Sequence, residues 1–136
     1  MADKRFLLEI ITPERVLVSE EVDTIIIPGT QGEFQIYYGH TPFLTDVAIG
    51  RISYDNGGKR SYLCISGGFC EVTPTRTLIL ARTAETTEMV DKERAQAARD
   101  RAMKRLADKA SVPIDEARAR LALFRAINRI SVADMR

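Results

Sequence analysis

The chain has 136 residues, which suffices for one ordinary domain or for a small domain with an appendage. Hydrophobic residues make up 45% and charged residues 29%, as in a soluble globular protein, and no apolar run approaches the roughly 18 residues of a membrane span. The first residues lead directly into an amphipathic pattern and lack the apolar stretch of a secretory signal. We therefore expect a cytosolic protein that is not inserted in a membrane.

The charges divide the chain into two unlike parts. Residues 1–89 contain 8 Lys and Arg against 12 Asp and Glu, a net charge of −4, whereas residues 90–136 contain 12 against 7, a net charge of +5. Of the nine Phe and Tyr residues, only Phe124 follows residue 89. The first part can build a compact core, and the second is an aromatic-poor helical arm. We predict a domain over residues 1–84 and a second over residues 85–136.

Short β-branched and aromatic runs separated by turn residues fill the first part. Turns are expected at Pro28–Gly29, at the hairpin signal Asp55–Gly58, at Ser66–Gly68 and at Pro74–Arg76. Strands are expected at residues 4–11, 15–18, 22–27, 34–37, 43–47, 50–54, 62–65, 69–73 and 77–83. Strands every 8–12 residues with turn signals between them predict an antiparallel β-sandwich or barrel.

The second part changes to a helical period. We predict a first helix from about Val90 to Lys109, a break at Ser111–Pro113, and a second helix from about Pro113 to Ile130. The apolar faces expected to pair are Ala95, Ala98, Ala102, Leu106 and Ala110 on the first helix and Ile114, Ala117, Leu121, Phe124 and Ile127 on the second. The predicted fold class is α+β: an N-terminal antiparallel β-sandwich followed by a C-terminal two-helix antiparallel hairpin.

Neither the cysteines nor the single histidine indicates catalysis. Cys64 and Cys70 are six residues apart around a glycine pair, which favours two buried thiols over a disulfide, and gives no zinc spacing. Glu33 and His40 could in principle be a general base and acid, but no nucleophile or second acid accompanies them. We expect no metal site, no required cofactor and no enzymatic activity of the chain by itself.

Two segments resemble a known family. Residues 32–45 read G-E-F-Q-I-Y-Y-G-H-T-P-F-L-T and are similar to the pattern G-E-x-x-I-x-x-x-H-x-P-x-L-T of epsilon subunits of F-type ATP synthases, and residues 62–68 resemble that family's Y-x-x-x-S-G-G. The end of the second helix, residues 128–133, is also similar. The resemblance covers essentially the whole chain. It implies a ten-stranded sandwich with two helices, placed in the central rotor, peripheral on the cytoplasmic face of the cell membrane.

The resemblance also implies partners. The sandwich would contact the gamma subunit and the membrane c-ring, and the arm would reach the alpha and beta subunits of the catalytic head. Candidate residues for the gamma and c-ring contact are Glu33, Tyr37, Tyr38 and His40, and we expect Glu33 and His40 on exposed loops at one end of the sandwich. The aromatic residues suit an interface, but partly exposed core aromatics explain them equally well.

Residues 90–95, V-D-K-E-R-A, resemble the [IL]-D-x-x-R-A motif with which some bacterial epsilon subunits bind ATP. Asp at i and Arg at i+3 share a helix face, a spacing that is also common in simple ion pairs. The residues that the resemblance assigns to ATP are Glu85, Asp91, Arg94, Ala95, Arg125 and Arg129. ATP would then be a regulatory ligand that stabilises a folded-down arm.

The extended arm would instead present Arg118, Arg125 and Arg129 to acidic surfaces of the catalytic head and inhibit hydrolysis, as the family does. Two other functions remain open at this point. The net charge of +5 could serve nucleic-acid binding, although acidic residues are interspersed and no aromatic stacking platform is present. A free-standing ATP sensor would use the same ligand residues but would leave the surface of residues 32–45 unexplained.

Overall fold

A computed structural model describes residues 4–108 and 113–135, with the backbone only for residues 113–115. The chain divides into two compact units, residues 1–85 and 86–136, each of which is described here by itself. The division falls one residue from the predicted boundary.

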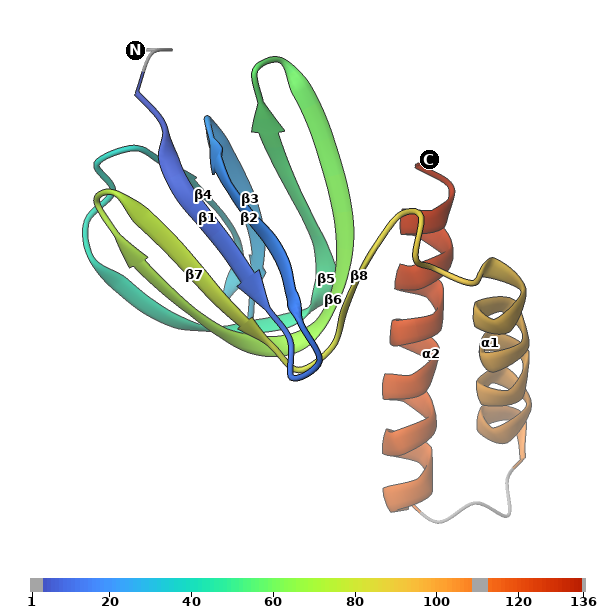
Figure 1. Ribbon diagram of the computed structural model, residues 1–136. Coiled ribbons are helices and arrows are strands. Elements are labelled where there is room, and N and C mark those ends of the chain that lie inside the picture. The colour runs from blue at the N-terminus through green and yellow to red at the C-terminus, as the bar shows by residue number, and fades with distance from the viewer. Residues whose placement is uncertain (1–3, 109–112, 136) are drawn as a thin grey trace. The chain divides into compact units, whose positions relative to one another are not determined.

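The first unit contains eight described strands and the second contains two helices (Figure 1). The strands are β1 (Phe6–Ile11), β2 (Val16–Val22), β3 (Thr24–Gly29), β4 (Gly32–Tyr37), β5 (Phe43–Asn56), β6 (Lys59–Thr73), β7 (Arg76–Ala81) and β8 (Ala84–Thr86). The helices are α1 (Lys92–Ala107) and α2 (Pro113–Ala133). The α+β class with a sandwich before a helical hairpin is confirmed.

The strands follow the order β2-β1-β7-β6-β5-β3-β4, and β8 pairs with β6. All pairs between consecutive strands are antiparallel, whereas β1 and β7 are parallel. Figure 1 shows β5 and β6 bending together, so that one half of each strand belongs to one layer and the other half to the second. The sheet thereby folds onto itself and encloses a core.

Side chains that point between the layers are large, apolar and almost completely inaccessible. The fully buried members with the greatest volume are Phe6, Leu8, Ile10, Ile25, Ile27, Ile36, Ile52, Leu63, Ile65, Ile79, Val22 and Val72. Alternation along β1 illustrates the cause: Phe6, Leu8 and Ile10 point inward and the residues between them do not. This core places the outward-pointing residues of each strand on a rigid base.

Two expectations about the strands are wrong. The turn expected at Ser66–Gly68 lies inside β6, where Gly67 and Gly68 have φ values of 80° and 151° and bend the strand without ending it. A side chain at Gly68 would approach the Leu80 carbonyl oxygen to 2.4 Å, so glycine is required there. The implied ten strands are eight in the described residues, because β5 and β6 continue through both layers. The hairpin turn at Gly57–Gly58 is confirmed.

The two helices of the second unit pack against each other. Both are of the predicted extent within two to three residues, while residues 109–112, including the expected break and Ala110, lie outside the described part. Lys92 at the start of α1 forms an ion pair with Asp134 just beyond α2, with 2.5 Å between Nζ and Oδ1. The helices are therefore antiparallel, as predicted.

The face of α2 that meets α1 is not the predicted one. Leu121, Phe124 and Ile127 are about half exposed, and the side chain of Ile114 is outside the described residues. The apolar residues buried in the helical unit are small: Val90, Ala95, Ala102, Ala119, Ala126, Val132 and Ala133. Alanines seven residues apart on each helix make a narrow seam, since small side chains permit close approach of the helices. Neither α1 nor the described part of α2 has the long apolar stretch that a membrane-spanning helix needs.

Candidate functional site

The first turn of α1 holds the residues of the ATP-binding resemblance. Asp91 is the N-cap: its backbone is extended, and its Oδ1 accepts a hydrogen bond from the backbone N–H of Arg94 at 3.1 Å. Ala95 is buried in the seam, with 4% of its surface exposed. Arg94 is exposed, and its guanidinium has no ion-pair partner among the described residues.

The Lys92–Asp134 ion pair identifies residues of the two helices that lie at about the same height along the hairpin axis. At about 1.5 Å per residue, Arg94 lies roughly 3 Å along the axis from this pair and Arg129 roughly 7.5 Å. Arg125 lies about 13.5 Å from it. Three predicted phosphate-binding arginines thus lie within about 10 Å of one another along the helical axis, near the end of the hairpin where α1 begins.

They also share one face of the helical unit. Arg94 immediately precedes Ala95 and Arg125 immediately precedes Ala126, so each is turned by about 100° from the seam. In an antiparallel pair of helices, the residue that immediately precedes a seam residue projects to the same side of the hairpin on both helices. Arg129, three residues after Ala126, points to that side as well. The structure therefore brings the predicted arginines of both helices together.

The same argument adds residues that the sequence analysis missed or assigned elsewhere. Arg101 precedes the seam residue Ala102, and Arg118 precedes Ala119, so both join this face. We call Arg94, Arg101, Arg118, Arg125 and Arg129 the arginine face. The signal in the sequence was the repeated pair Arg-Ala, with Arg at residues 94, 101, 118 and 125, so that successive pairs on each helix begin seven positions apart.

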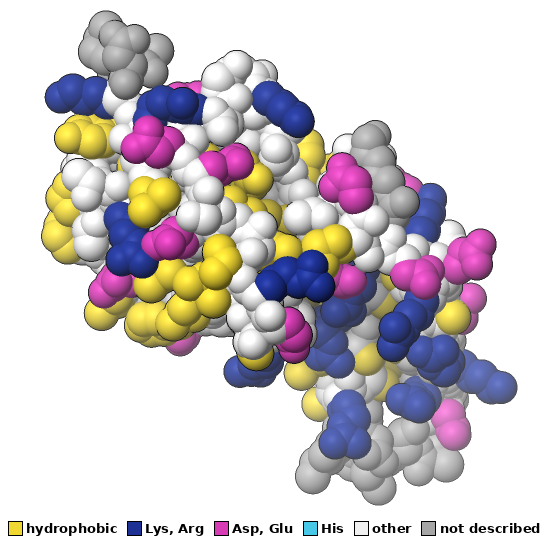
Figure 2. Space-filling view, in the orientation of Figure 1, with side chains coloured by type: hydrophobic (Ala, Val, Ile, Leu, Met, Phe, Trp, Pro, Cys, Tyr) yellow, Lys and Arg dark blue, Asp and Glu magenta, His cyan; other side chains and the backbone are white. Residues whose placement is uncertain are grey.

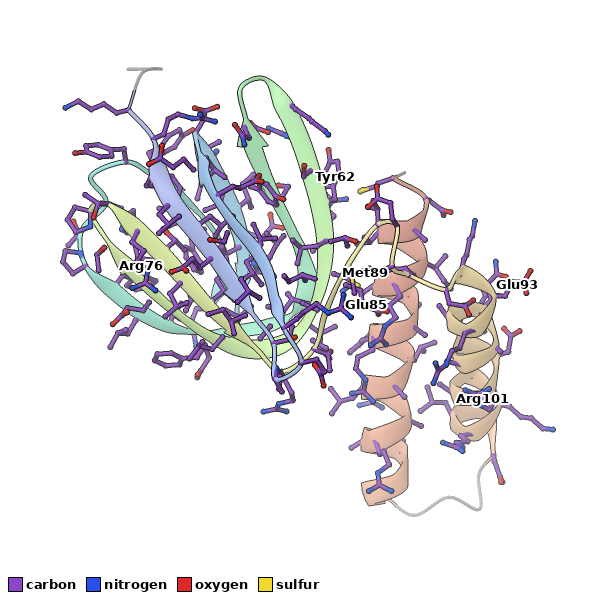
Figure 3. The ribbon with its side chains drawn as sticks, viewed as in Figure 1. Tyr62, Arg76, Glu85, Met89, Glu93 and Arg101 are labelled. Atoms are coloured by element: carbon purple, nitrogen blue, oxygen red, sulfur yellow. The ribbon has the colours of Figure 1, made fainter. Side chains whose placement is uncertain are left out.

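Charge pairing separates this face from the rest of the hairpin. Arg99 pairs with Asp100 at 3.1 Å and Arg120 with Glu116 at 3.0 Å, all away from the arginine face. Among the described residues, Arg94, Arg101, Arg118 and Arg125 have no ion pair. Figure 2 shows Lys and Arg side chains gathered over the helical unit, and Figure 3 shows Glu93 on the side of α1 remote from α2. Guanidinium groups on one face are the kind of group to which a multiply charged anion binds.

The remaining predicted ligand, Glu85, belongs to the first unit. It is half buried in β8, and its carbonyl oxygen lies 3.5 Å from the Sγ of Cys64 on β6. Glu85 therefore lies in the sandwich unit, whereas the arginine face belongs to the helical unit.

The predicted interface residues of the sandwich lie around β4. Tyr37 and Tyr38 are 59% and 41% exposed, and the Lys4 ammonium lies 5.3 Å from the centre of the Tyr38 ring. The Nδ1 of His40 donates a hydrogen bond to the Thr41 carbonyl oxygen at 2.6 Å. These side chains belong to the surface and not to the core, which favours the interface interpretation of the two tyrosines.

The expectation that Glu33 and His40 both lie on exposed loops at one end of the sandwich is wrong for Glu33. It is an exposed residue of β4, opposite Pro28 of β3, and His40 follows the other end of that strand. Because β3 turns into β4 within two residues, with φ of 122° at Gly32, the strand has already begun at Glu33. The strand β4 therefore separates the two residues.

The outer side of the sandwich carries a shallow groove of about 560 Å³. Phe69 and Leu80 lie opposite each other on β6 and β7, 43% and 48% exposed, and both line it. Figure 2 shows apolar side chains gathered on the sandwich. An apolar surface of this kind is typical of a protein contact.

The two cysteines are buried and form no disulfide. Burial, and secondarily the charge of Glu71, raises the pKa of the Cys70 thiol to about 12. A thiol with this pKa is protonated at neutral pH and is a poor nucleophile, in agreement with the buried-thiol interpretation.

Comparison with known proteins agrees with these two units. Residues 5–87 match the beta-sandwich domain, and residues 88–134 the long alpha-helix domain, of the ATP synthase delta/epsilon chain. The chain is 46% identical over 137 residues to the ATP synthase epsilon chain of Desulforapulum autotrophicum, covering all of both chains. It is also 46% identical to that of Desulforamulus reducens, covering 93% of this chain and 96% of the relative.

Solved structures agree on the fold. A chain of the Euglena gracilis mitochondrial ATP synthase (OSCP/F1/c-ring) superposes with a TM-score of 0.82 at 22% identity, covering all of this chain and 84% of the other. A chain of the Tetrahymena thermophila mitochondrial ATP synthase (central stalk/c-ring) gives 0.63 at 10% identity, covering 98% and 99%. With both domain profiles and full-length relatives matched, this chain belongs to the ATP synthase delta/epsilon chain family.

Proposed function

We propose that this chain is a non-catalytic epsilon subunit of the central rotor of an F-type ATP synthase, and that its helical hairpin binds ATP through the arginine face. Peripheral attachment at the cytoplasmic face of the membrane follows from that assembly. The observation that supports the ATP proposal is that Arg94 and Arg101 of α1 and Arg118 and Arg125 of α2, none of them in an ion pair among the described residues, lie on one face of the hairpin.

The chemistry of this face fits a triphosphate. Guanidinium groups bind phosphate oxygens through paired hydrogen bonds, and several positive charges offset the cost of bringing a multiply charged anion to one place. Arg94 and Arg129 are about 4.5 Å apart along the axis, and Arg101 and Arg125 are at the same level, about 6 Å further along the axis than Arg129. Such a spread suits an extended chain of phosphates better than a single carboxylate.

Binding would regulate the hairpin. The arginines of α1 and α2 repel one another when the helices are side by side, and a bound polyphosphate removes that repulsion. Since a ligand shifts a conformational equilibrium only by its difference in affinity for the two states, ATP would favour the closed hairpin. An extended arm would free Arg118, Arg125 and Arg129 for acidic surfaces of the alpha and beta subunits and thereby inhibit hydrolysis.

The sandwich would supply the rotor contacts. Its exposed Tyr37 and Tyr38, the neighbouring His40 and the carboxylate of Glu33 are surface groups that a c-ring loop or the gamma subunit can meet. The apolar groove with Phe69 and Leu80 is a second candidate surface for the gamma subunit. Co-purification of a gamma subunit with the full chain is the expected result, and loss of coupled ATP synthesis is expected for Glu33→Gln combined with His40→Ala.

Calorimetric titration of the full chain with ATP tests the nucleotide site. We expect binding that weakens about tenfold or more for Arg94→Ala and for Arg125→Ala, because each removes a charged hydrogen bond to phosphate. Arg120→Ala is the matched control: it removes an arginine from the same unit whose charge is paired with Glu116. Its effect should be within about twofold.

Two further results would distinguish nucleotide binding from the alternative functions. Duplex DNA binding as tightly as ATP to the same face would favour the nucleic-acid function instead. No binding at millimolar ATP, or binding unaltered by both face substitutions, would refute the nucleotide site and leave the family membership intact.

A further inference from the structure

The turn between β5 and β6 contains an Asn-Gly step, which is chemically labile. Asn56 precedes Gly57, whereas the only other asparagine of the chain, Asn128, precedes Arg129. At an Asn-Gly step the backbone nitrogen of the glycine can lose its proton and attack the side-chain amide carbon, because glycine has no side chain to obstruct the approach. A cyclic imide forms and ammonia leaves, and water then opens the ring to aspartate or isoaspartate. Asn56 is therefore the asparagine of this chain that is suited to spontaneous deamidation.

The groups that would react are all engaged in hydrogen bonds. The amide oxygen of Asn56 accepts a hydrogen bond from the Arg5 guanidinium, and its amide nitrogen donates to the Glu20 carboxylate at 3.4 Å. The backbone N–H of Gly57, the attacking group, donates to Oδ2 of Asp23 at 2.8 Å. Oδ1 of Asp23 accepts from Nε of Arg5 at 3.2 Å. One guanidinium thus contacts both the Asn56 amide and the carboxylate that holds the Gly57 N–H. We call Arg5, Glu20 and Asp23 the hairpin clamp.

The hairpin clamp exists only in the folded sandwich. Arg5 precedes β1, Glu20 lies in β2, and Asp23 follows β2, so the three residues are 33 or more positions away from Asn56 in sequence. All four side chains are partly buried, and the backbone of Asn56 pairs with Lys59 across the hairpin. Ring closure needs the Asn56 amide carbon to move onto the next backbone nitrogen, and that nitrogen to give up its proton. The contacts of the clamp must break before either can happen.

We propose that Asn56 is a latent deamidation site, which the hairpin clamp protects in the folded chain and which reacts when this end of the sandwich opens. The reaction replaces an amide that donates to Glu20 by a carboxylate, which only accepts. That carboxylate, Glu20 and Asp23 would then surround one guanidinium and repel one another. Isoaspartate would in addition lengthen the backbone of a hairpin whose strands pair residue by residue. Deamidation would therefore oppose reformation of the clamp and make a transient opening permanent.

The experiment incubates the full chain in mildly alkaline buffer, with and without urea, and follows both asparagines by peptide mapping and mass spectrometry. In the folded chain we expect Asn56 to react at least about tenfold more slowly than in urea, since only the locally open fraction can react. Arg5→Gln should accelerate the reaction of the folded chain about threefold or more, because it removes charged hydrogen bonds to Asn56 and Asp23. Asn128 is the internal control and should react far more slowly than Asn56 in urea.

Arg60→Gln is the matched control, since it removes an arginine of the same hairpin whose guanidinium pairs with Asp55. It should change the rate at Asn56 by less than about twofold, because the pair is exposed. Equal acceleration by Arg5→Gln and Arg60→Gln would overturn the role of the clamp, because general stability of the hairpin would then explain the protection. Asp23→Ala should also accelerate the reaction; a slower reaction would make Asp23 the base that takes the Gly57 proton and would overturn the protective role. If neither clamp variant folds, the unsubstituted chain decides: equal rates with and without urea would overturn the proposal.

Discussion

The two units are stabilised by different kinds of side chain. The sandwich buries large residues such as Ile25, Ile52 and Leu63 completely, whereas the seam between the helices is built mainly from alanine. Burial of a large aliphatic side chain contributes about 1.5–3 kcal/mol, and a single methylene-sized group only about 0.8 kcal/mol. The sandwich can therefore serve as a fixed base, whereas the hairpin loses little stability when its packing changes. The switching that we propose for the arm requires this second property.

The largest effect is expected from a cavity in the sandwich. Ile52→Ala should lower the free energy of unfolding by about 2–5 kcal/mol, because Ile52 is completely buried on β5. Urea unfolding followed by tyrosine fluorescence measures it, since all four tyrosines belong to the first unit. Leu80→Ala, at a side chain that is 48% exposed, is the control and should cost under about 1 kcal/mol. Equal costs at the two sites would contradict the account of the core.

A larger side chain in the alanine seam should destabilise the helical unit without affecting the sandwich. Ala126→Leu should destabilise the helical unit by about 1–3 kcal/mol, because the closely packed helices have no room for the added atoms. Far-ultraviolet circular dichroism should show helix loss at lower urea, while the tyrosine transition stays in place. Ala97→Leu, at an exposed position of α1, should leave both transitions unchanged. A shift of both transitions by Ala126→Leu would mean that the units unfold as one.

Local signals explain how much of the fold could be predicted. Asp55–Gly58 identified the β5–β6 hairpin because two glycines with positive φ are what a two-residue turn demands. The same glycine signal failed at Gly67–Gly68, where positive φ bends a strand that remains paired on both sides. The pairing partners that keep β6 continuous are distant in sequence, so the local pattern could not distinguish a bend from a turn.

The helical unit shows a second limit. The sequence pattern placed the large side chains Leu121, Phe124 and Ile127 on the apolar face of α2. In the structure these three are about half exposed, and the alanines are buried instead. Once Ala119 and Ala126 are recognised as the seam, the preceding arginines fall on one face. Arg94 and Arg125 could be chosen from the resemblance; their grouping with Arg101 depended on which residues form the seam, and this is a property of the pair of helices.

The ion pair between Lys92 and Asp134 is expected to have a smaller effect. Its side chains are 45% and 54% exposed, and exposed pairs contribute about 0.2–1 kcal/mol. A double-mutant cycle with Lys92→Ala and Asp134→Ala, followed by helix loss in urea, should give a coupling in this range that falls at high salt. Arg120→Ala with Glu116→Ala provides a matched exposed pair within one helix. A coupling that salt does not change would exclude an ionic origin.

The smallest effect concerns the pH dependence of the sandwich. The Arg60 guanidinium donates hydrogen bonds to Asp55 at 2.8 and 3.1 Å and lowers the pKa of that carboxyl from its ordinary value of 3.8. Because the folded pKa is the lower one, the pair contributes stability above about pH 4, and this contribution is lost as the pH falls through the folded pKa. Asp55→Asn should therefore reduce the acid dependence of the tyrosine-detected unfolding midpoint below pH 4, and should lower the midpoint at neutral pH. The control is Asp46→Asn, at an exposed carboxylate without an ion pair among the described residues. Since solvent screens an exposed pair, the change should be smaller than that from any core substitution, and an unaltered pH profile in Asp55→Asn would show that Arg60 does not hold the Asp55 carboxylate in the folded state.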